Sequence, residues 1–422
     1  MIEFELRKGA LHCEDVPLRT IADAVGTPVY VYSTALVQRR AREFKAGVAA
    51  LDNSLITFAV KANPNAAILA TLVREGFGAD VVSGGEYRRA RAAGVPANKI
   101  VFSGVGKTAD EMTLALAGGL FQFNVESRAE LEMLSSVAVS VGRRAPISIR
   151  INPDVTAGSH AKISTGAAQD KFGISAADVV AAFDLARELP GIEPQGVAIH
   201  IGSQLTSLEP LELAFSRLGA LIDQLRQAGH RIKVADLGGG LGVSYDATKP
   251  MPPTASSYGA MVERVAGPWG VQLVFEPGRL IVGEAGVLLT QVIRLKDGAT
   301  HPFVIVDAAM NDLIRPTLYE AWHEIEAVVP TGEKMVADIV GPVCESGDTF
   351  ARARKTDRVE AGDLMVIRTV GAYAATMGSS YNSRPLAAEV LVNGSDWAVV
   401  RERQDLEALI RGDIIPTWLK KV

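Results

Sequence analysis

The feature that most constrains this chain is an alternation of short apolar runs with helix-like segments, repeated eight times between residues 55 and 275. The runs are rich in Val, Ile, Leu and Phe, as in parallel strands buried on both faces. The predicted strands are Leu55–Val60, Ala79–Val82, Ile100–Phe102, Leu120–Val125, Pro146–Ile151, Gly196–Ile199, Ile232–Leu237 and Val271–Phe275. Eight units, with no GxGxxG motif after the first strand, favour a closed (β/α)8 TIM barrel over an open doubly wound sheet.

Helix-like segments lie between the predicted strands. The first is predicted to begin at Asn63-Pro64, because asparagine is a good N-cap and proline is favoured at the first helical position. Other helices are predicted to begin near Gly85, Thr108, Ser127, Ser175, Leu208 and Ser256.

The alternation stops after about residue 283, where strand-like runs separated by polar turns predict a mostly antiparallel β domain, a sandwich or a barrel. These runs are Val287–Leu295, Phe303–Asp307, Leu364–Thr369 and Ala388–Val392. A short β segment before a closed barrel needs a pairing partner elsewhere. The predicted domains are therefore an N-terminal β segment, 1–33, that joins the C-terminal β domain, 283–422, and a (β/α)8 barrel, 34–282.

Composition excludes several classes of protein. A chain of 422 residues with 48% apolar and 22% charged residues is expected to form two globular domains. The net charge of −5, with no basic block, argues against nucleic acid and anionic membranes as partners. Cys13 and Cys344 have no metal-type spacing, so neither a zinc site nor a disulfide framework is expected. No signal peptide or transmembrane run is recognisable, and we expect a cytoplasmic protein without a bound metal.

The carboxyl ends of the predicted strands are unusually polar. They present Lys61, Ser83, Ser103-Gly104, Glu126, Asn152, His200, Gly238-Gly239-Gly240 and Glu276. The active sites of TIM barrels lie at this face. A lysine at the mouth of a buried strand is partly desolvated, which favours the nucleophilic amine. The alternative for Lys61 alone is a solvated lysine that starts a loop.

Barrels often bind phosphate with the loops after strands seven and eight, which here are Asp236–Gly242 and Glu276–Arg279. Glycines let backbone N–H groups turn towards an anion. Lys61 opposite such loops suggests pyridoxal phosphate, with Glu276 at the pyridine nitrogen and His200 flat against the ring. Ser203 is a candidate for the phosphate site. Asp80 is expected either to face the cofactor or to bond to Lys61.

Alternatives remain open for the individual residues. The glycine run can be a tight turn, Glu276 can pair with Arg279 or another surface arginine, and His200 can be a hydrogen-bonded core histidine.

Several motifs match a known family. Phe58–Asn63, His200–Gln204, Gly238–Gly240 and Glu276–Arg279 resemble the pyridoxal-phosphate decarboxylases of fold type III, the alanine racemase-like fold. Further segments resemble the diaminopimelate decarboxylases within that group: Asn311–Pro316, Tyr319, Cys344–Asp348, Gly371–Tyr373 and Tyr381–Pro385. The resemblance covers essentially the whole chain.

The resemblance implies a role for each matching residue. Lys61 would hold the cofactor covalently, His200 would stack on its ring, and Cys344 would donate the proton to Cα. The remaining cofactor-binding residues would be Asp80, Ser203, Gly239, Gly240, Glu276, Gly278, Arg279 and Tyr373. The substrate-binding residues would be Arg279, Arg315, Tyr319, Glu345 and Tyr373. The family acts on meso-diaminopimelate, an amino acid, as a homodimer in which Cys344 and Glu345 enter the partner's site.

The chemistry of these residues is consistent with those roles. Arginine offers a planar fork for the carboxylate that stays on the substrate, and Glu345 offers an anion for the distal ammonium. A thiol is mostly protonated at neutral pH and can therefore give up a proton.

Three rival functions remain. An ornithine or arginine decarboxylase of the same fold would usually carry Cys-Asp where this chain has Cys344-Glu345, and it would lack the pattern around Arg315. An amino-acid racemase needs a base on each face of Cα, typically a tyrosine opposite the lysine. A non-catalytic pyridoxal-phosphate-binding protein of this type would be a lone barrel.

Two local features stand apart from these assignments. Leu280 follows Arg279 where many relatives have a small polar residue, so it supplies no hydroxyl to the site. The loop around Asp154–Lys171 is long and rich in Gly, Ser and Thr, which suggests a lid over the substrate.

Overall fold

The computed structural model describes residues 3–155, 165–166 and 169–420. The chain forms two compact units: Leu36–Glu284 is one, and Met1–Ala35 together with Ala285–Val422 is the other. Most of the segment 154–171, for which we hypothesise a lid, lies outside the described residues. Among the described residues, no helix is long and apolar enough to cross a lipid bilayer.

The unit Leu36–Glu284 is a closed barrel of eight parallel strands. The strands are β5 (Leu55–Ala59), β6 (Gly78–Val81), β7 (Ile100–Phe102), β8 (Gln122–Val125), β9 (Ala145–Asn152), β11 (Ile192–Ala198), β12 (Val234–Asp236) and β13 (Gln272–Phe275). Neighbours along this series pair in parallel, and β13 pairs with β5 to close the ring. The predicted (β/α)8 barrel is confirmed, and each strand overlaps its predicted range.

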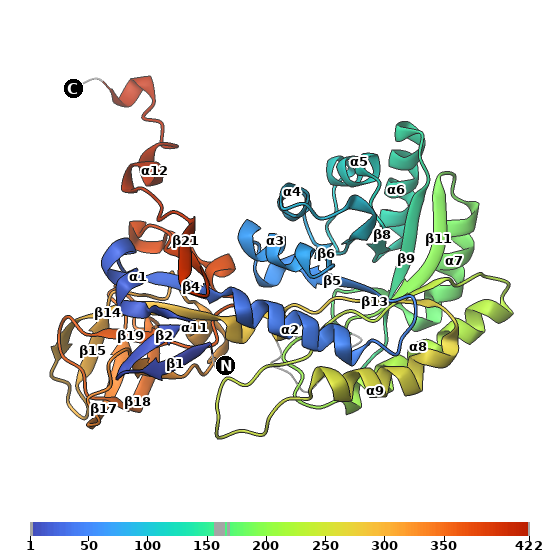
Figure 1. Ribbon diagram of the computed structural model, residues 1–422. Helices are drawn as coiled ribbons and strands as arrows, with labels where there is room; N and C mark the ends of the chain where they lie inside the picture. Colours follow the sequence, from blue (N-terminus) through green and yellow to red (C-terminus); the bar gives the residue numbers. More distant parts are fainter. Residues whose placement is uncertain (1–2, 156–164, 167–168, 421–422) are drawn as a thin grey trace. The chain divides into compact units, whose positions relative to one another are not determined.

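Helices alternate with these strands along the chain (Figure 1). They are α2 (Thr34–Gly47), α3 (Ala66–Arg74), α4 (Gly84–Ala92), α5 (Ala109–Gly118), α6 (Arg128–Val141), α7 (Val179–Glu188), α8 (Glu209–Gln227) and α9 (Ala255–Ala266). The predicted start of α3 is wrong by two residues. The Asn63 side chain accepts the N–H of Asn65 in a local turn, and the side chain of Asn65 then caps the helix by accepting the N–H of Ala67.

The barrel interior changes from apolar to polar along the strands. Leu55, Val101, Val234 and Val274 form one buried cluster. Asp236 follows Val234 by two residues, and Glu276 follows Val274 by the same interval, so the period of a strand keeps each pair on one face. Each of these chain segments therefore carries an apolar side chain first and a carboxyl group nearer the site.

The second unit is built on a nine-stranded sheet that is mostly antiparallel, as predicted. Its strands are β4 (Val29–Ser33), β14 (Gly286–Lys296), β15 (Phe303–Val306), β16 (Ile325–Ala327), β17 (Lys334–Val340), β18 (Thr349–Asp357), β19 (Leu364–Ile367), β20 (Ala388–Asn393) and β21 (Asp396–Arg401). Strand β4 lies between β14 and β20, so the N-terminal segment pairs with strands from the end of the chain. The parallel pairs are β15 with β17 and β20 with β4.

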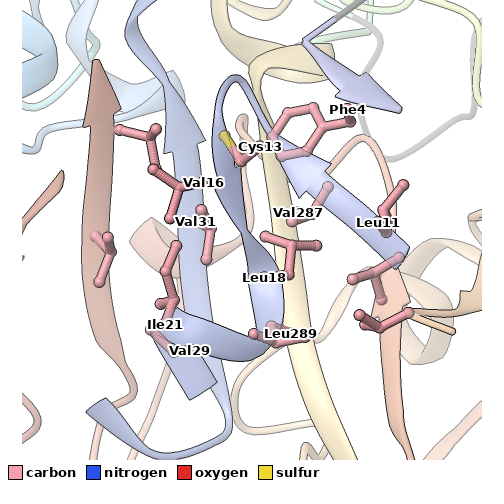
Figure 2. Close-up of a cluster of buried hydrophobic side chains, with 14 of the residues drawn as sticks. Phe4, Leu11, Cys13, Val16, Leu18, Ile21, Val29, Val31, Val287 and Leu289 are labelled. Carbon is pink, nitrogen blue, oxygen red and sulfur yellow. The ribbon is translucent and has the colours of Figure 1, made fainter. Parts of the chain in front are cut away.

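A small antiparallel sheet covers part of this unit. It contains β1 (Phe4–Arg7), β2 (Ala10–Cys13) and β3 (Val16–Pro17), and helix α1 (Leu18–Val25) follows directly. Figure 2 shows the apolar side chains of these elements packed against those of β4 and β14. Because Leu18 and Ile21 are fully buried in this cluster, the N-terminal elements contribute side chains to the core of the unit.

Candidate active site

Lys61 lies in a short 3-10 turn, Val60–Ala62, directly after β5. Its Nζ atom donates a hydrogen bond to Oδ2 of Asp80 over 2.6 Å. Asp80, on the neighbouring strand β6, is fully buried, whereas the Lys61 side chain keeps 34% of its surface exposed. Of the two alternatives for Asp80, the bond to Lys61 is present in this structure. The amine is therefore anchored at a fixed position and remains reachable from solvent.

Two more buried carboxyl groups, Asp236 and Glu276, lie near this pair. Asn124 Nδ2 donates to Oδ2 of Asp236 over 2.9 Å and to Oε1 of Glu276 over 3.4 Å. Burial raises the pKa of Asp236 to about 6. Burial, reinforced by the charges of Asp236 and Asp80, raises the pKa of Glu276 well above its usual range. Of these two carboxyl groups, Glu276 is therefore the harder one to ionise.

His200 follows β11 by two residues and is held by the glycine loop. The N–H of Gly239 donates to Nδ1 of His200 over 3.3 Å. Burial and the positive charges of Arg150 and Lys61 lower the pKa of His200 well below its ordinary value. The ring is consequently neutral, with its proton on Nε2.

The glycine loop after β12 has no room for side chains. Gly238 has φ +65°, and a Cβ atom there would lie 2.8 Å from Nδ1 of His200. A Cβ on Gly239 would lie 2.2 Å from the carbonyl oxygen of Glu276. The run is thus a tight turn, and it also brings its backbone against both His200 and Glu276.

Arg279 begins the short helix α10 (Arg279–Val282) and is 6% exposed. Its Nη2 atom donates to Ser203 Oγ over 3.0 Å, and Nη1 donates to the Tyr245 hydroxyl over 2.6 Å. The alternative pairing of Glu276 with Arg279 is not among the contacts of the described residues. Leu280 lines a small pocket with Phe44 and Tyr258, on the side of the glycine loop that faces α2 and α9.

Three polar residues at this end of the barrel were not predicted: Asn124, Tyr245 and Arg150. Asp236 was included only as the first residue of a predicted phosphate-binding loop. Arg150, in β9, donates from Nη1 to Glu126 Oε1 over 2.9 Å, and both side chains are buried. Asn124 and Arg150 each interrupt an apolar strand, which is the signal that identifies such positions. Tyr245 has no comparable signal in the sequence.

The remaining predicted residues lie in the second unit. Arg315 begins α11 (Arg315–Tyr319), is 6% exposed, and has Nη1 3.2 Å from Nε2 of His323. Tyr319 ends this helix half-buried, and Tyr373 is half-buried with φ +54°. Nδ1 of His323 lies 2.8 Å from the Arg368 carbonyl oxygen, so His323 is oriented from both sides.

Cys344 and Glu345 occupy a loop of the second unit, and both are exposed. The backbone N–H of Cys344 donates to Oδ1 of Asn382 over 3.4 Å. Glu345 accepts a hydrogen bond from the Tyr381 hydroxyl, which raises the pKa of that phenol. The thiol of this loop is therefore accessible on its own unit.

Comparison with known proteins gives consistent matches. The family described as pyridoxal-dependent decarboxylase, pyridoxal binding domain, matches residues 34–283. Diaminopimelate decarboxylase of Zymomonas mobilis is 54% identical over 99% of this chain and 100% of its own length. The crystal structure of diaminopimelate decarboxylase from M. jannaschii with L-lysine is 35% identical, with TM-score 0.95 over 99% of both chains. That from Helicobacter pylori, also with L-lysine, is 40% identical, with TM-score 0.90 over 93% of this chain and 98% of its own.

Proposed function

The chain belongs to the pyridoxal-dependent decarboxylases, in the diaminopimelate decarboxylase family, and from this premise we propose that it converts meso-2,6-diaminopimelate into L-lysine and carbon dioxide. This reaction is the last step of bacterial-type lysine biosynthesis. The observation that carries the proposal is the 54% identity with a named diaminopimelate decarboxylase over the full length of both proteins. A match of that extent includes the second unit, where the candidate substrate-selecting residues lie.

The barrel fits pyridoxal phosphate in its charge balance. Three buried carboxyl groups, on Asp80, Asp236 and Glu276, lie near a single lysine, so the site can accept a cationic ring nitrogen. Oδ1 of Asp80 is buried and has no hydrogen-bond partner among the described residues. When bound, the cofactor supplies an electron sink for the electrons left behind by the departing carboxylate.

We assign the cofactor contacts to the following residues. Lys61 would hold the cofactor through its aldehyde carbon, Glu276 would serve the ring nitrogen, and the neutral His200 would serve the ring face. The phosphate would be held by Ser203, Gly239, Gly240, Gly278 and Arg279, and the cofactor would also be contacted by Asp80 and Tyr373. The contacts between His200 and Gly239 and between Ser203 and Arg279 support one continuous site at this rim.

Substrate recognition is assigned to charged residues of both units. Arg279 and Arg315 offer planar forks for carboxylate, and Glu345 offers an anion for the distal ammonium. Tyr319 and Tyr373 complete the substrate-binding set. The orientation of Arg315 by His323 supports a fixed carboxylate-binding geometry, because a guanidinium held by packing loses little entropy when a ligand binds.

Cys344 is the proposed proton donor to Cα after carbon dioxide leaves. An exposed thiol is suited to this role only if another surface covers it, because water competes for reactive carbanions. We therefore propose a homodimer in which Cys344 and Glu345 of one subunit complete the barrel site of the partner. Both cysteines are free thiols, which is compatible with the reducing cytoplasm in which we place the enzyme.

The test is carbon dioxide release from meso-diaminopimelate, compared with L-ornithine, L-arginine and L-lysine, with pyridoxal phosphate added. We expect release from diaminopimelate alone. Release from a simple diamino acid in its place would retain the cofactor chemistry of Lys61 and overturn the roles of Arg315 and Glu345.

A further inference from the structure

The loop that carries Cys344 is fastened by one buried carboxylate. Asp348 is 3% exposed, and its two oxygens accept hydrogen bonds from two different segments. Oδ2 accepts the N–H of Val343, the residue before Cys344, and Oδ1 accepts the N–H of Met310, each over 2.7 Å. A single side chain thus ties the thiol loop to a segment that precedes it by more than thirty residues.

The segment on the other side leads to the candidate substrate-binding arginine. Met310 lies five residues before Arg315, the first residue of α11. Helix α11 itself also contacts the loop, because Thr317 Oγ1 donates to the carbonyl oxygen of Gly347 over 2.7 Å. One contact therefore joins the loop to the segment before α11, and a second joins it to α11.

The Asp348 carboxylate packs directly against the backbone of Gly341. A Cβ atom on Gly341 would lie 2.4 Å from one of its oxygens and 2.5 Å from the other, so only glycine fits beside it. The loop also turns back on itself, since the N–H of Asp348 donates to the carbonyl oxygen of Glu345 over 3.0 Å. The charged side chains that act on this carboxylate are Arg384 and Glu345.

We propose that Asp348 is a positioning residue, which fixes the backbone of Cys344 and Glu345 relative to Arg315. It acts through two charge-assisted hydrogen bonds and touches no reacting atom itself. This inference rests on the proposed function for the roles of Cys344 and Arg315. The two hydrogen bonds that Asp348 accepts lie within the second unit, and their effect on the loop can be tested without turnover.

The chain offers a direct probe of the thiol. It has two cysteines; Cys13 is fully buried in the core of the second unit, whereas Cys344 is exposed. Iodoacetamide is small enough to enter an active site that holds no substrate, so its alkylation rate in the folded holoenzyme reports Cys344 even where the partner subunit of the proposed homodimer covers the loop. We would measure this rate against pH for Asp348→Asn, which keeps the shape of the side chain but turns one acceptor into a donor.

The matched control is Asp363→Asn. Asp363 belongs to the same unit and also accepts a backbone hydrogen bond, from the N–H of Glu360 over 2.7 Å, in a turn before β19. For Asp348→Asn we expect the limiting alkylation rate at high pH to change at least about threefold. We also expect kcat to fall about tenfold, the loss of roughly one charge-assisted hydrogen bond, with the visible absorbance of bound cofactor retained.

Two outcomes would overturn the proposal. One is a folded Asp348→Asn protein with the alkylation profile and kcat of the control. The other is a shifted pH midpoint with an unchanged limiting rate, since Asp348 would then act on the thiol through its charge and not through position. If Asp348→Asn does not fold, Gly341→Ala displaces the same carboxylate and is judged by the same criteria. Failure of the proposed function can be distinguished from failure of this proposal. In the former case the wild-type protein would release no carbon dioxide from diaminopimelate, but the alkylation rates of the variants could still be compared.

Discussion

The Nζ atom of Lys61 and the Oδ2 atom of Asp80 lie 2.6 Å apart and join the ends of two neighbouring barrel strands. Asp80 is fully buried, whereas Lys61 is only partly buried. The ammonium group of Lys61 therefore compensates the buried negative charge of Asp80.

Replacing Lys61 tests the cofactor assignment. Lys61→Ala is expected to abolish the visible absorbance of covalently bound pyridoxal phosphate and to reduce decarboxylation to background, because no amine remains at this position. Lys45→Ala is the control, since the Lys45 amine donates to the Glu75 carbonyl oxygen at an exposed site. The measurement is the visible absorbance spectrum of each purified protein, compared with that of the wild type. A band like that of the wild type in Lys61→Ala would refute the assignment.

The buried pair of Asp236 and Glu276 predicts a pH-dependent stability of the apoprotein. The pKa of Asp236 is raised in the folded state to about 6, and an unfolded aspartate titrates near 3.9. Between about pH 4 and pH 6 the folded protein keeps the proton that the unfolded chain loses. The free energy of unfolding therefore falls as pH rises through this window, by at most about 3 kcal/mol for this group.

Urea denaturation of the apoprotein at several pH values measures this slope. In Asp236→Asn the part of the pH slope that comes from residue 236 is expected to disappear, because an amide does not titrate. This holds whether the substitution raises or lowers the free energy of unfolding itself. Asp223→Asn, at a carboxylate with 72% of its surface exposed, should keep the wild-type slope. Equal slopes in wild type and Asp236→Asn would contradict the raised pKa.

The contact between Arg315 and His323 predicts an effect on substrate affinity. Nδ1 of His323 donates to the Arg368 carbonyl oxygen, which leaves Nε2 as an acceptor for Arg315. In His323→Ala the guanidinium loses this restraint, and KM for diaminopimelate should rise about five- to thirtyfold, equivalent to roughly 1–2 kcal/mol. The absorbance of bound cofactor should not change. His301→Ala, in a loop of the same unit, is the control, and an unchanged KM in His323→Ala would remove His323 from substrate recognition.

Mixed subunits test the shared site. Lys61→Ala and Cys344→Ala are each expected to be nearly inactive, because one lacks the cofactor link and the other the proton donor. If Cys344 serves the partner's barrel, a mixed dimer holds one site with both residues intact. Mixing the two proteins under conditions of subunit exchange should then restore up to about a quarter of wild-type activity, as random pairing places an intact site in half of the dimers. Subunit exchange can be demonstrated by mass. If activity does not recover although exchange has occurred, the active site is not shared between subunits.

The barrel was predictable because its signal is local and repeated. Most of the strands lie in short, largely apolar runs, and polar residues such as Lys61, His200 and Glu276 follow where parallel strands end. The start of α3 was misplaced because both Asn63 and Asn65 make capping-type hydrogen bonds, and only the three-dimensional turn selects between them.

The residues missed in the site depend on neighbours that are distant in sequence. Asn124 contacts Asp236 and Glu276, which follow it by more than one hundred residues. Tyr245 reaches Arg279 from a loop without a recognisable motif. No pattern within a single strand or helix encodes such contacts, so they become visible only once the barrel is closed.

The layered interior of the barrel separates two properties that protein engineers often find in conflict. Heat resistance can be sought by repacking around Val101 and Val234, where the lining is hydrocarbon and volume-conserving exchanges cost little. Selectivity for new amino acids would instead be pursued at the opposite rim, where the ionisable groups are. The apolar cluster and the polar rim lie at successive levels of the same strands. Substitutions that raise heat resistance in the cluster can therefore be combined with substitutions that change selectivity at the rim.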